Sequence, residues 1–175
     1  EARPWLDGKI TIHFAYERTE ASGEDLFNTA YLEETASAAG FKTKRICMDE
    51  IGHDMASDRM VHGIGGPPID VNFAQYPRDS IWNEEGGKPI FRDMADPHKR
   101  GTVWINPPYT AAILGNKAIL AILWQLFADD HRYNRYLLPA YFAGGNPMRD
   151  YALKPIFGRE GASTQLVEGG RELEV

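Results

Sequence analysis

The residues with the clearest potential for chemistry lie in the stretch 150–164. A short apolar run ends in Lys154, which predicts a strand, and two glycines then bracket Arg159 and Glu160. Glycines allow several backbone N–H groups to converge on one anion, and the lysine and the arginine add positive charge at the same place. This combination suits the phosphates of a nucleoside triphosphate. The alternative is a β-hairpin whose turn happens to contain an arginine, and the local pattern alone favours the hairpin.

A second candidate for binding an anion is Lys117, within a single long helix predicted over 109–127. It shares one stripe of that helix with apolar residues at helical spacing, namely Ile113, Leu120, Trp124 and Phe127. Burying an ammonium group without a partner is expensive, so two interpretations stay open. Lys117 either extends to water from the first turns of the helix or reaches toward a bound anion.

Two acidic residues, Glu24 and Asp25, begin a helix predicted over 24–39. Ser22 stands three residues before Asp25, which predicts a carboxylate variant of the capping box. Acids in a first helical turn favour the helix dipole and need no ligand to explain them, but a polycationic amine would be drawn to the same pair. Ser80, at the start of another predicted helix, is typical of an ordinary helix cap.

The elements that position these residues alternate between strand and helix. Strands are predicted over 8–17, 41–48, 69–74 and 102–106. The first two strands with the helix between them form a β-α-β unit, in which a parallel pair is expected. In the third strand the inward-facing set is Ile69, Val71 and Phe73, and the segments 49–68 and 86–101 are predicted as turns and connector. The fold class is therefore α/β, a small open mixed sheet with flanking helices.

Composition limits the function further. The 175 residues provide one core, or one domain with an appendage, and the net charge of −6 argues against nucleic acid as a partner. A single cysteine, Cys47, excludes an internal disulfide framework, which fits a reducing cytoplasm. The five histidines lack the spacing of zinc ligands, which argues against a zinc site. The longest apolar segment, 111–127, is interrupted by polar residues, so we expect a buried helix and no membrane span, and no signal peptide is recognisable.

Three blocks in the last third, taken in order, carry a resemblance to a known family. They are 115–120 (GNKAIL), 137–140 (LLPA) and 154–161 (KPIFGREG). This order resembles the synthetase domain of the glutathionylspermidine synthase family, whose members are ATP-grasp carboxylate–amine ligases. The resemblance implies a pre-ATP-grasp-like substrate domain over 1–108. It implies that 109–175 is a helix plus β-hairpin that starts the nucleotide-binding lid.

The resemblance also implies roles for residues of the first and the last block. Lys117 and Lys154 match two lysines that contact ATP, and Arg159 matches the catalytic arginine that stabilises the transferring phosphate. The loop that folds over the nucleotide is matched by Gly158, Glu160 and Gly161.

For the substrates, Glu24 and Asp25 match a pair of acids near the polyamine or glutathione site, and Ser80 matches a hydroxyl residue near the thiol-peptide substrate. The implied reaction is amide formation between a peptide carboxylate such as glutathione and an amine such as spermidine. ATP activates the carboxylate as an acyl phosphate, and the amine then displaces phosphate. Mg²⁺ normally bridges the phosphates, and the family's metal ligands precede the stretch that 8–17 matches, so they are expected outside this chain.

Three hypotheses remain open at this point. The residues could be part of a full ligase, whose remaining parts complete the active site. They could instead form a non-catalytic module, derived from such a ligase, that binds a nucleotide or a protein partner. A purely structural α/β domain that docks onto a larger protein is the third, and the apolar helix over 109–127 would suit such docking.

Overall fold

The computed structural model of the protein describes residues 10–18, 21–95, 101–159 and 161–173. The chain divides into two compact units, residues 1–111 and residues 112–175.

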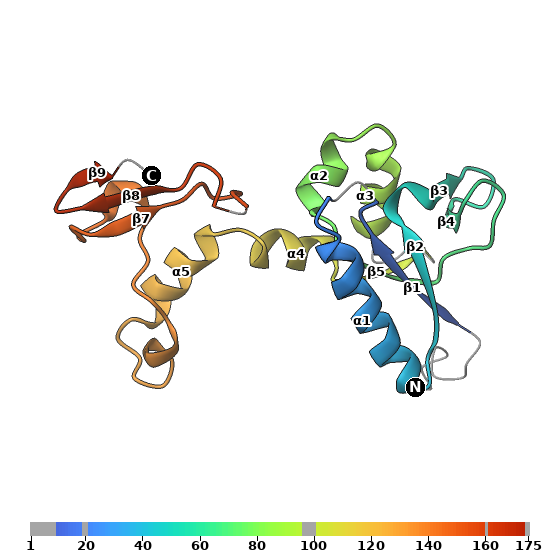
Figure 1. Ribbon diagram of the computed structural model, residues 1–175, viewed down its shortest axis with the longest axis horizontal. Helices are drawn as coiled ribbons and strands as arrows, with labels where there is room; N and C mark the ends of the chain where they lie inside the picture. Colours follow the sequence, from blue (N-terminus) through green and yellow to red (C-terminus); the bar gives the residue numbers. More distant parts are fainter. Residues whose placement is uncertain (1–9, 19–20, 96–100, 160, 174–175) are drawn as a thin grey trace. The chain divides into compact units, whose positions relative to one another are not determined.

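The first unit is built on a four-stranded sheet in which every strand pair is parallel. Its strands are β1 (Thr11–Tyr16), β2 (Lys42–Cys47), β5 (Val71–Ala74) and β6 (Val103–Ile105). Their order is β2-β1-β5-β6, so β1 and β5 are central neighbours (Figure 1). The α/β class is confirmed, and so is the parallel pairing of the first two strands.

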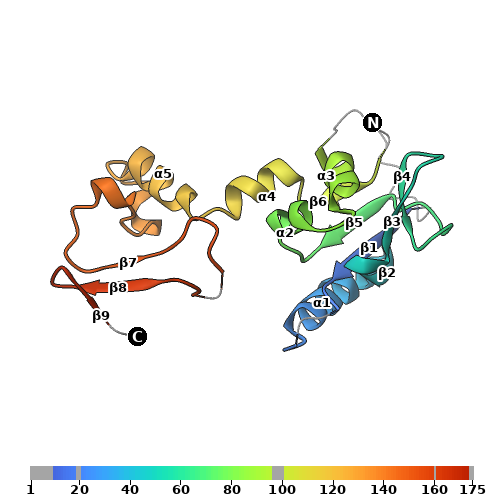
Figure 2. The same ribbon diagram turned by 90° about the horizontal axis from the view of Figure 1, so that it is seen from above.

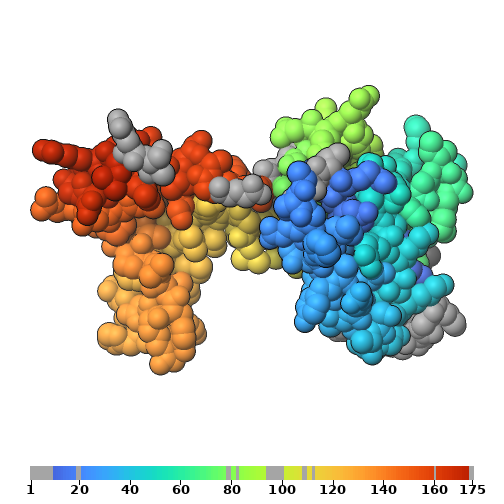
Figure 3. Space-filling model, viewed as in Figure 1, coloured from blue at the N-terminus to red at the C-terminus, as the bar shows by residue number. Residues whose placement is uncertain are grey.

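The two faces of this sheet are covered by different elements. One face carries α1 (Glu24–Ala38), which is tied to β2 by a 2.7 Å ion pair between Arg45 and Glu33. The opposite face carries the hairpin of β3 (Ile51–Asp54) and β4 (Arg59–His62), with α2 (Arg78–Asn83) and α3 (Gly87–Ala95) beside it. Figure 2 shows α1 on one side of the sheet and the hairpin and α3 on the other, and the space-filling view shows α1 on the near surface of the unit (Figure 3).

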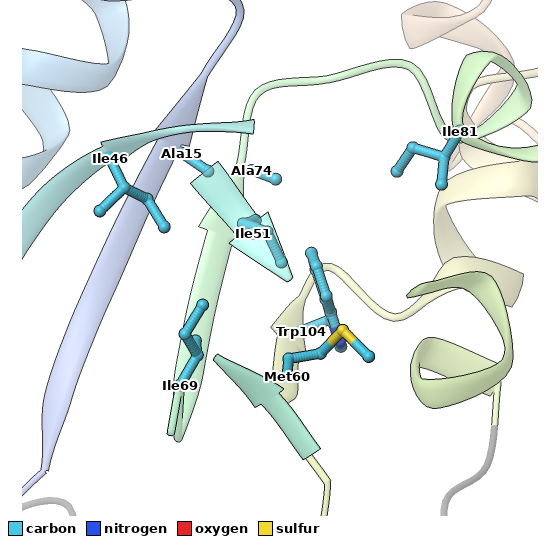
Figure 4. Close-up of a cluster of buried hydrophobic side chains, with 8 residues drawn as sticks. All are labelled: Ala15, Ile46, Ile51, Met60, Ile69, Ala74, Ile81 and Trp104. Carbon is cyan, nitrogen blue, oxygen red and sulfur yellow. The ribbon is translucent and has the colours of Figure 1, made fainter. Parts of the chain in front are cut away.

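The core lies between the sheet and this second layer (Figure 4). The sheet contributes Ala15, Ile46, Ala74 and Trp104, and the covering elements contribute Ile51, Met60, Ile69 and Ile81. Because the central strands are covered on both faces, Asn72 and Ala74 are buried as well as Val71. The predicted inward set of Ile69, Val71 and Phe73 was therefore incomplete. Buried and exposed side chains alternate strictly only where one face of the sheet is open to solvent.

Turns and connector were predicted over 49–68 and 86–101, but the structure has the β3–β4 hairpin and α3 (Gly87–Ala95) there, with the short helix η2 (Met48–Glu50) leading into the hairpin. The hairpin strands have four residues each, too few for a clear alternating pattern, although Ile51 and Met60 reach the core. In α3, Pro89 lies in the first turn, where backbone N–H groups have no carbonyl partner within the helix. The absence of an N–H on the proline therefore costs no helical hydrogen bond.

The second unit contains the end of α4, a further helix and a small sheet. The helices are α4 (Pro108–Leu114), α5 (Ala118–Phe127), η3 (Asn134–Tyr136) and η4 (Ala143–Gly145). The sheet joins β7 (Tyr151–Leu153), β8 (Gln165–Glu168) and β9 (Arg171–Leu173) in antiparallel order. The predicted single helix over 109–127 is wrong, because Asn116 Oδ1 accepts the Ala118 N–H at 2.8 Å and starts a new helix there.

Apolar side chains of this unit are mostly exposed. Ala121 is its only buried hydrophobic residue among those described, whereas Leu126 is 66% and Leu138 85% exposed. The prediction of a buried helix is thus wrong for the chain by itself. Across the described ranges, no helix has the length and apolarity required to cross a bilayer.

Candidate functional site

The strand order creates a topological switch point between β1 and β5. From β1 the chain passes through α1 to β2 on one side, and from β5 it passes through α2 and α3 to β6 on the other. In open α/β sheets ligands bind outside the carboxyl ends of the strands at such a point. Residues that directly follow β1 and β5 are therefore candidates for substrate binding.

Asp25 lies at this edge and contacts the segment that follows β5. Gln75, directly after β5, donates a hydrogen bond from Nε2 to Asp25 Oδ1 at 3.2 Å. The helix is capped by Gly23, with φ 73°, and Ser22 Oγ accepts the Glu24 N–H at 3.1 Å. The capping box predicted with Ser22 as the cap is wrong, because the left-handed glycine lies between that serine and the helix.

Ser80 is brought to the same edge by α2, which follows β5. Its backbone N–H donates to the carbonyl oxygen of Pro77 at 3.2 Å, and Pro77 is the N-cap residue. Ser80 therefore lies inside the first turn, after the position of the helix cap that the sequence suggested for it. The substrate roles of Glu24, Asp25 and Ser80 stay predictions.

A cavity of about 360 Å³ opens at this edge, and its charged lining was not predicted. The charged and phenolic side chains that line it are Glu17, Arg18, Asp49, Tyr76, Glu84 and Glu85. Four carboxylates against one guanidinium give the lining a negative balance. Glu24, Asp25 and Ser80 do not line it. Glu17 is the last residue of the strand predicted over 8–17, and Tyr76 comes two residues after the strand predicted over 69–74. This position at the carboxyl ends of two strands was the signal that could have identified the site.

Three interactions fix the lining. Arg18 donates to Asp49 at 3.0 Å and to Glu50 at 3.1 Å. The Tyr76 hydroxyl donates to a carboxylate oxygen of Glu84, and burial followed by this hydrogen bond raises the pKa of Tyr76 above its ordinary value. The phenol is therefore a donor at physiological pH, not an anion.

The predicted nucleotide residues come together in the second unit. A cavity of about 220 Å³ is lined by Lys117, Lys154, Gly158 and Gly161, together with Pro155, Ala162 and Thr164. Lys117 caps α5, its backbone N–H donates to the Ile156 carbonyl at 2.9 Å, and its ammonium group donates to the Gly158 carbonyl. Residues far apart in the sequence thus form one wall, although their role toward ATP stays a prediction.

Arg159 and Glu160 are the two other loop residues that were predicted to act at this site. Arg159 is exposed and does not line the cavity, while its carbonyl accepts the Ala162 N–H at 2.8 Å. Glu160 lies outside the described residues.

Side chains that could bind magnesium are scattered through the chain. Over the part of the chain that the structure describes, no group of three or more His, Cys, Asp or Glu side chains is arranged to hold a metal ion. The described residues do not fit Mg²⁺, and no chemical step is assigned to it.

Comparison with known proteins decides the family. The sequence profile described as "Glutathionylspermidine synthase preATP-grasp" matches residues 3–175. The chain belongs to this family. The resemblance inferred from the ordered blocks is therefore confirmed, together with the fold class that it implied.

Individual relatives share moderate identity with the chain. A Haemophilus influenzae protein provisionally named an acid–amine ligase is 29% identical over 170 residues, which cover 95% of this chain and 40% of that protein. The bifunctional glutathionylspermidine synthetase/amidase of Escherichia coli is 30% identical over 168 residues, covering 86% of this chain and 26% of that protein. The protein of the same name from Shigella flexneri matches equally well. The chain thus spans less than half the length of these relatives.

Proposed function

We propose that this chain is the pre-ATP-grasp portion of an ATP-dependent carboxylate–amine ligase, which forms an amide through an acyl phosphate. The observation that carries the proposal is the cavity shared by Lys117, Lys154, Gly158 and Gly161 in a chain of this family. Its volume, about 220 Å³, is below the roughly 300 Å³ at which sites for drug-sized ligands begin. The size suits phosphate groups, with the rest of a nucleotide bound by other parts of the enzyme.

ATP supplies the phosphoryl group that activates the carboxylate. The two lysines neutralise the phosphate charge, and the glycine backbone allows close approach of the loop. Lys117 is held in advance by the Gly158 carbonyl, so little reorganisation is needed when an anion arrives. Arg159, directly beside Gly158, is the group proposed to stabilise the transferring phosphoryl.

The amine would bind at the switch point of the first unit. A polyamine such as spermidine carries several positive charges, and this edge offers the carboxylates of Glu24 and Asp25 beside the acidic cavity of Glu17 and Glu84. Ser80 is proposed to contact the peptide substrate, glutathione in the relatives' names. Orientation of two substrates is the main demand of such a reaction.

Thermal unfolding with ATP and magnesium tests the nucleotide role on the chain itself. We expect saturating ATP to raise the Tm of the wild type, by the equivalent of about 2.7 kcal/mol at a hundredfold excess over Kd. Lys154→Ala should lose most of this shift. Lys88→Ala, which removes an exposed lysine from α3, is the matched control and should retain it. An absence of stabilisation by ATP would refute nucleotide binding by this chain.

A second role, docking without catalysis, is favoured by one observation. The second unit buries Ala121 alone among its described apolar residues, while Leu120, Leu126 and Leu138 are exposed. Exposed apolar surface of this extent is typical of an interface. The ATP titration separates the two roles, because a docking module without a nucleotide site would give equal unfolding curves with and without ATP.

A further inference from the structure

A second cavity of the first unit lies at the opposite edge of the sheet, where the strands begin. Its volume is about 580 Å³, and it is lined by Thr11, His13, Lys42, Thr43, Lys44, Arg59, Pro67, Pro68 and Asp70. Thr11 and Lys42 are the first residues of β1 and β2, and Asp70 directly precedes β5. The cavity is therefore separate from the switch point at the carboxyl ends.

The charge of this cavity is opposite to that of the chain. Lys42, Lys44 and Arg59 line it against one carboxylate, Asp70, although the chain as a whole carries a net charge of −6. Arg59 Nη2 donates to Asp70 Oδ1 at 2.9 Å, which fixes the guanidinium at the wall. Arg59 Nε is buried and has no hydrogen-bond partner among the described residues.

His13 gives the cavity a buried polar group that also lacks a partner. Its side chain is on the face of β1 that carries the β3–β4 hairpin, and the residue is only 3% exposed. Its Nδ1 has no hydrogen-bond partner within the described ranges. Leaving a polar group buried and unsatisfied costs roughly 1–3 kcal/mol, so native structures seldom keep one without a use.

The surroundings of His13 favour the neutral form of its imidazole. Burial lowers the pKa of His13, and the nearby His62 and Lys44 act in the same direction, against Asp70 and the Thr11 carbonyl. A neutral imidazole still donates one N–H. In the tautomer that carries the proton on Nδ1, this nitrogen can donate to an acceptor, and the two lysines and Arg59 of the lining attract an acceptor with negative charge.

We propose that this cavity binds a small oxyanion, a phosphate or carboxylate group, between Lys42, Lys44, Arg59 and His13. Ammonium groups, a guanidinium and an imidazole approach it from β1, β2 and β4, which matches an anion with several acceptor oxygens. The volume lies inside the range of small-molecule sites, roughly 300–1,000 Å³, so the anionic group can belong to a larger organic molecule.

The test is a titration of the chain with inorganic phosphate at constant ionic strength, with chloride as the balancing ion. We expect phosphate to raise the Tm and to shift the imidazole NMR resonances of His13. Lys42→Gln/Lys44→Gln should weaken binding roughly tenfold or more, since two charges are lost at the site. Both lysines are exposed, so the variant is expected to fold. Lys88→Gln/Arg171→Gln removes two charges from exposed residues that do not line either of the proposed anion sites, and it should bind like the wild type.

Acetate in place of phosphate distinguishes the two sources of the anion. Shifts of the His13 resonances with both ions support an oxyanion site, and shifts with phosphate alone support a phosphate site. Equal responses to phosphate and chloride, or equal affinities of the wild type and Lys42→Gln/Lys44→Gln, would overturn the proposal.

Discussion

The ammonium group of Lys117 donates a hydrogen bond to the carbonyl oxygen of Gly158 and so joins α5 to the glycine loop. A hydrogen bond with a charged donor contributes roughly 1.5–3 kcal/mol. We expect Lys117→Met to accelerate amide hydrogen exchange in the loop 155–164 by roughly tenfold to a hundredfold, because the loop loses this attachment. Lys154→Met is the control, since it removes the same charge from the same cavity but keeps the bond. Equal exchange rates in the two variants would show that charge, and not the bond, holds the loop.

In the first unit, Asp93 joins α3 to β6 and to the residue that precedes β6 by hydrogen bonds. Its side chain is 3% exposed, and Oδ2 accepts the Trp104 indole N–H at 2.9 Å and the Thr102 N–H at 3.3 Å. Asp93→Ala removes the acceptor of both and should cost roughly 2–4 kcal/mol of unfolding free energy. Asp93→Asn keeps one oxygen acceptor and should cost less than half as much. Urea denaturation measures both, and equal losses would exclude acceptor geometry as the cause.

The pH dependence of stability should depend on Glu50. The Cys47 backbone N–H, at 2.8 Å, and the guanidinium of Arg18 lower the pKa of Glu50 below its ordinary value of 4.5. A carboxyl whose pKa is lower in the folded state stabilises the fold at pH values above its unfolded-state pKa. This stabilisation disappears as the pH falls through the folded-state pKa. Glu50→Gln should therefore be less stable than the wild type at neutral pH, by at most about 1 kcal/mol for such an exposed group.

The difference between the wild type and Glu50→Gln should shrink as the pH falls below 4.5. Urea midpoints measured at neutral pH and at about pH 3 test this window. If the difference between the two proteins stays constant through the acid range, the stabilisation comes from the hydrogen-bond geometry of the Glu50 side chain and not from its charge.

Spermidine should stabilise the chain through the acidic edge of the sheet. We expect Glu24→Gln/Asp25→Asn to weaken spermidine binding by roughly tenfold or more, because two carboxylates near the cation are lost. The amide that replaces the Asp25 carboxylate can still accept from Gln75, whose hydrogen bond is 3.2 Å in the wild type. Calorimetry with Glu168→Gln/Glu172→Gln as the control separates a local effect from net charge. Equal affinities in the two double variants would reduce Glu24 and Asp25 to helix-dipole residues.

The two units should differ in independent stability. Residues 1–111 contain a buried core of sheet and covering elements, so they should unfold cooperatively in urea when expressed alone. Residues 112–175 bury Ala121 alone among the described apolar side chains, which is too little to offset the chain entropy. We expect this fragment to show no cooperative transition. A sharp transition for the isolated fragment would mean that its exposed apolar residues are not required to pack elsewhere.

Local patterns predicted the β-α-β start well, because apolar alternation in β1 and the glycine stop of α1 are local features. Tertiary contacts determined the rest. The β3–β4 hairpin is held by Ile51 and Met60 against the sheet, and its strands of four residues each are too short to show a clear alternating pattern. Likewise, the break in the predicted long helix depends on one side-chain bond from Asn116.

The glycine loop after Lys154 shows the same limit at the level of the site. Its glycines and lysine were recognisable in the sequence, whereas two interpretations of Lys117 stayed open. Its attachment to Gly158 joins residues far apart in the chain, so only the fold could reveal it. The acidic cavity at the carboxyl edge was missed for a related reason, because Glu17, Tyr76 and Glu84 come from three separate segments.

The central strand β1 separates two cavities of opposite charge, one acidic beyond its last residue and one basic beside its first. Its six residues at about 3.3 Å each place the two ends roughly 20 Å apart. At physiological ionic strength the Debye length is only about 8 Å, so each cavity is electrically screened from the other. A cation and an anion can therefore occupy the two ends at the same time, with neither measurably altering the affinity of the other.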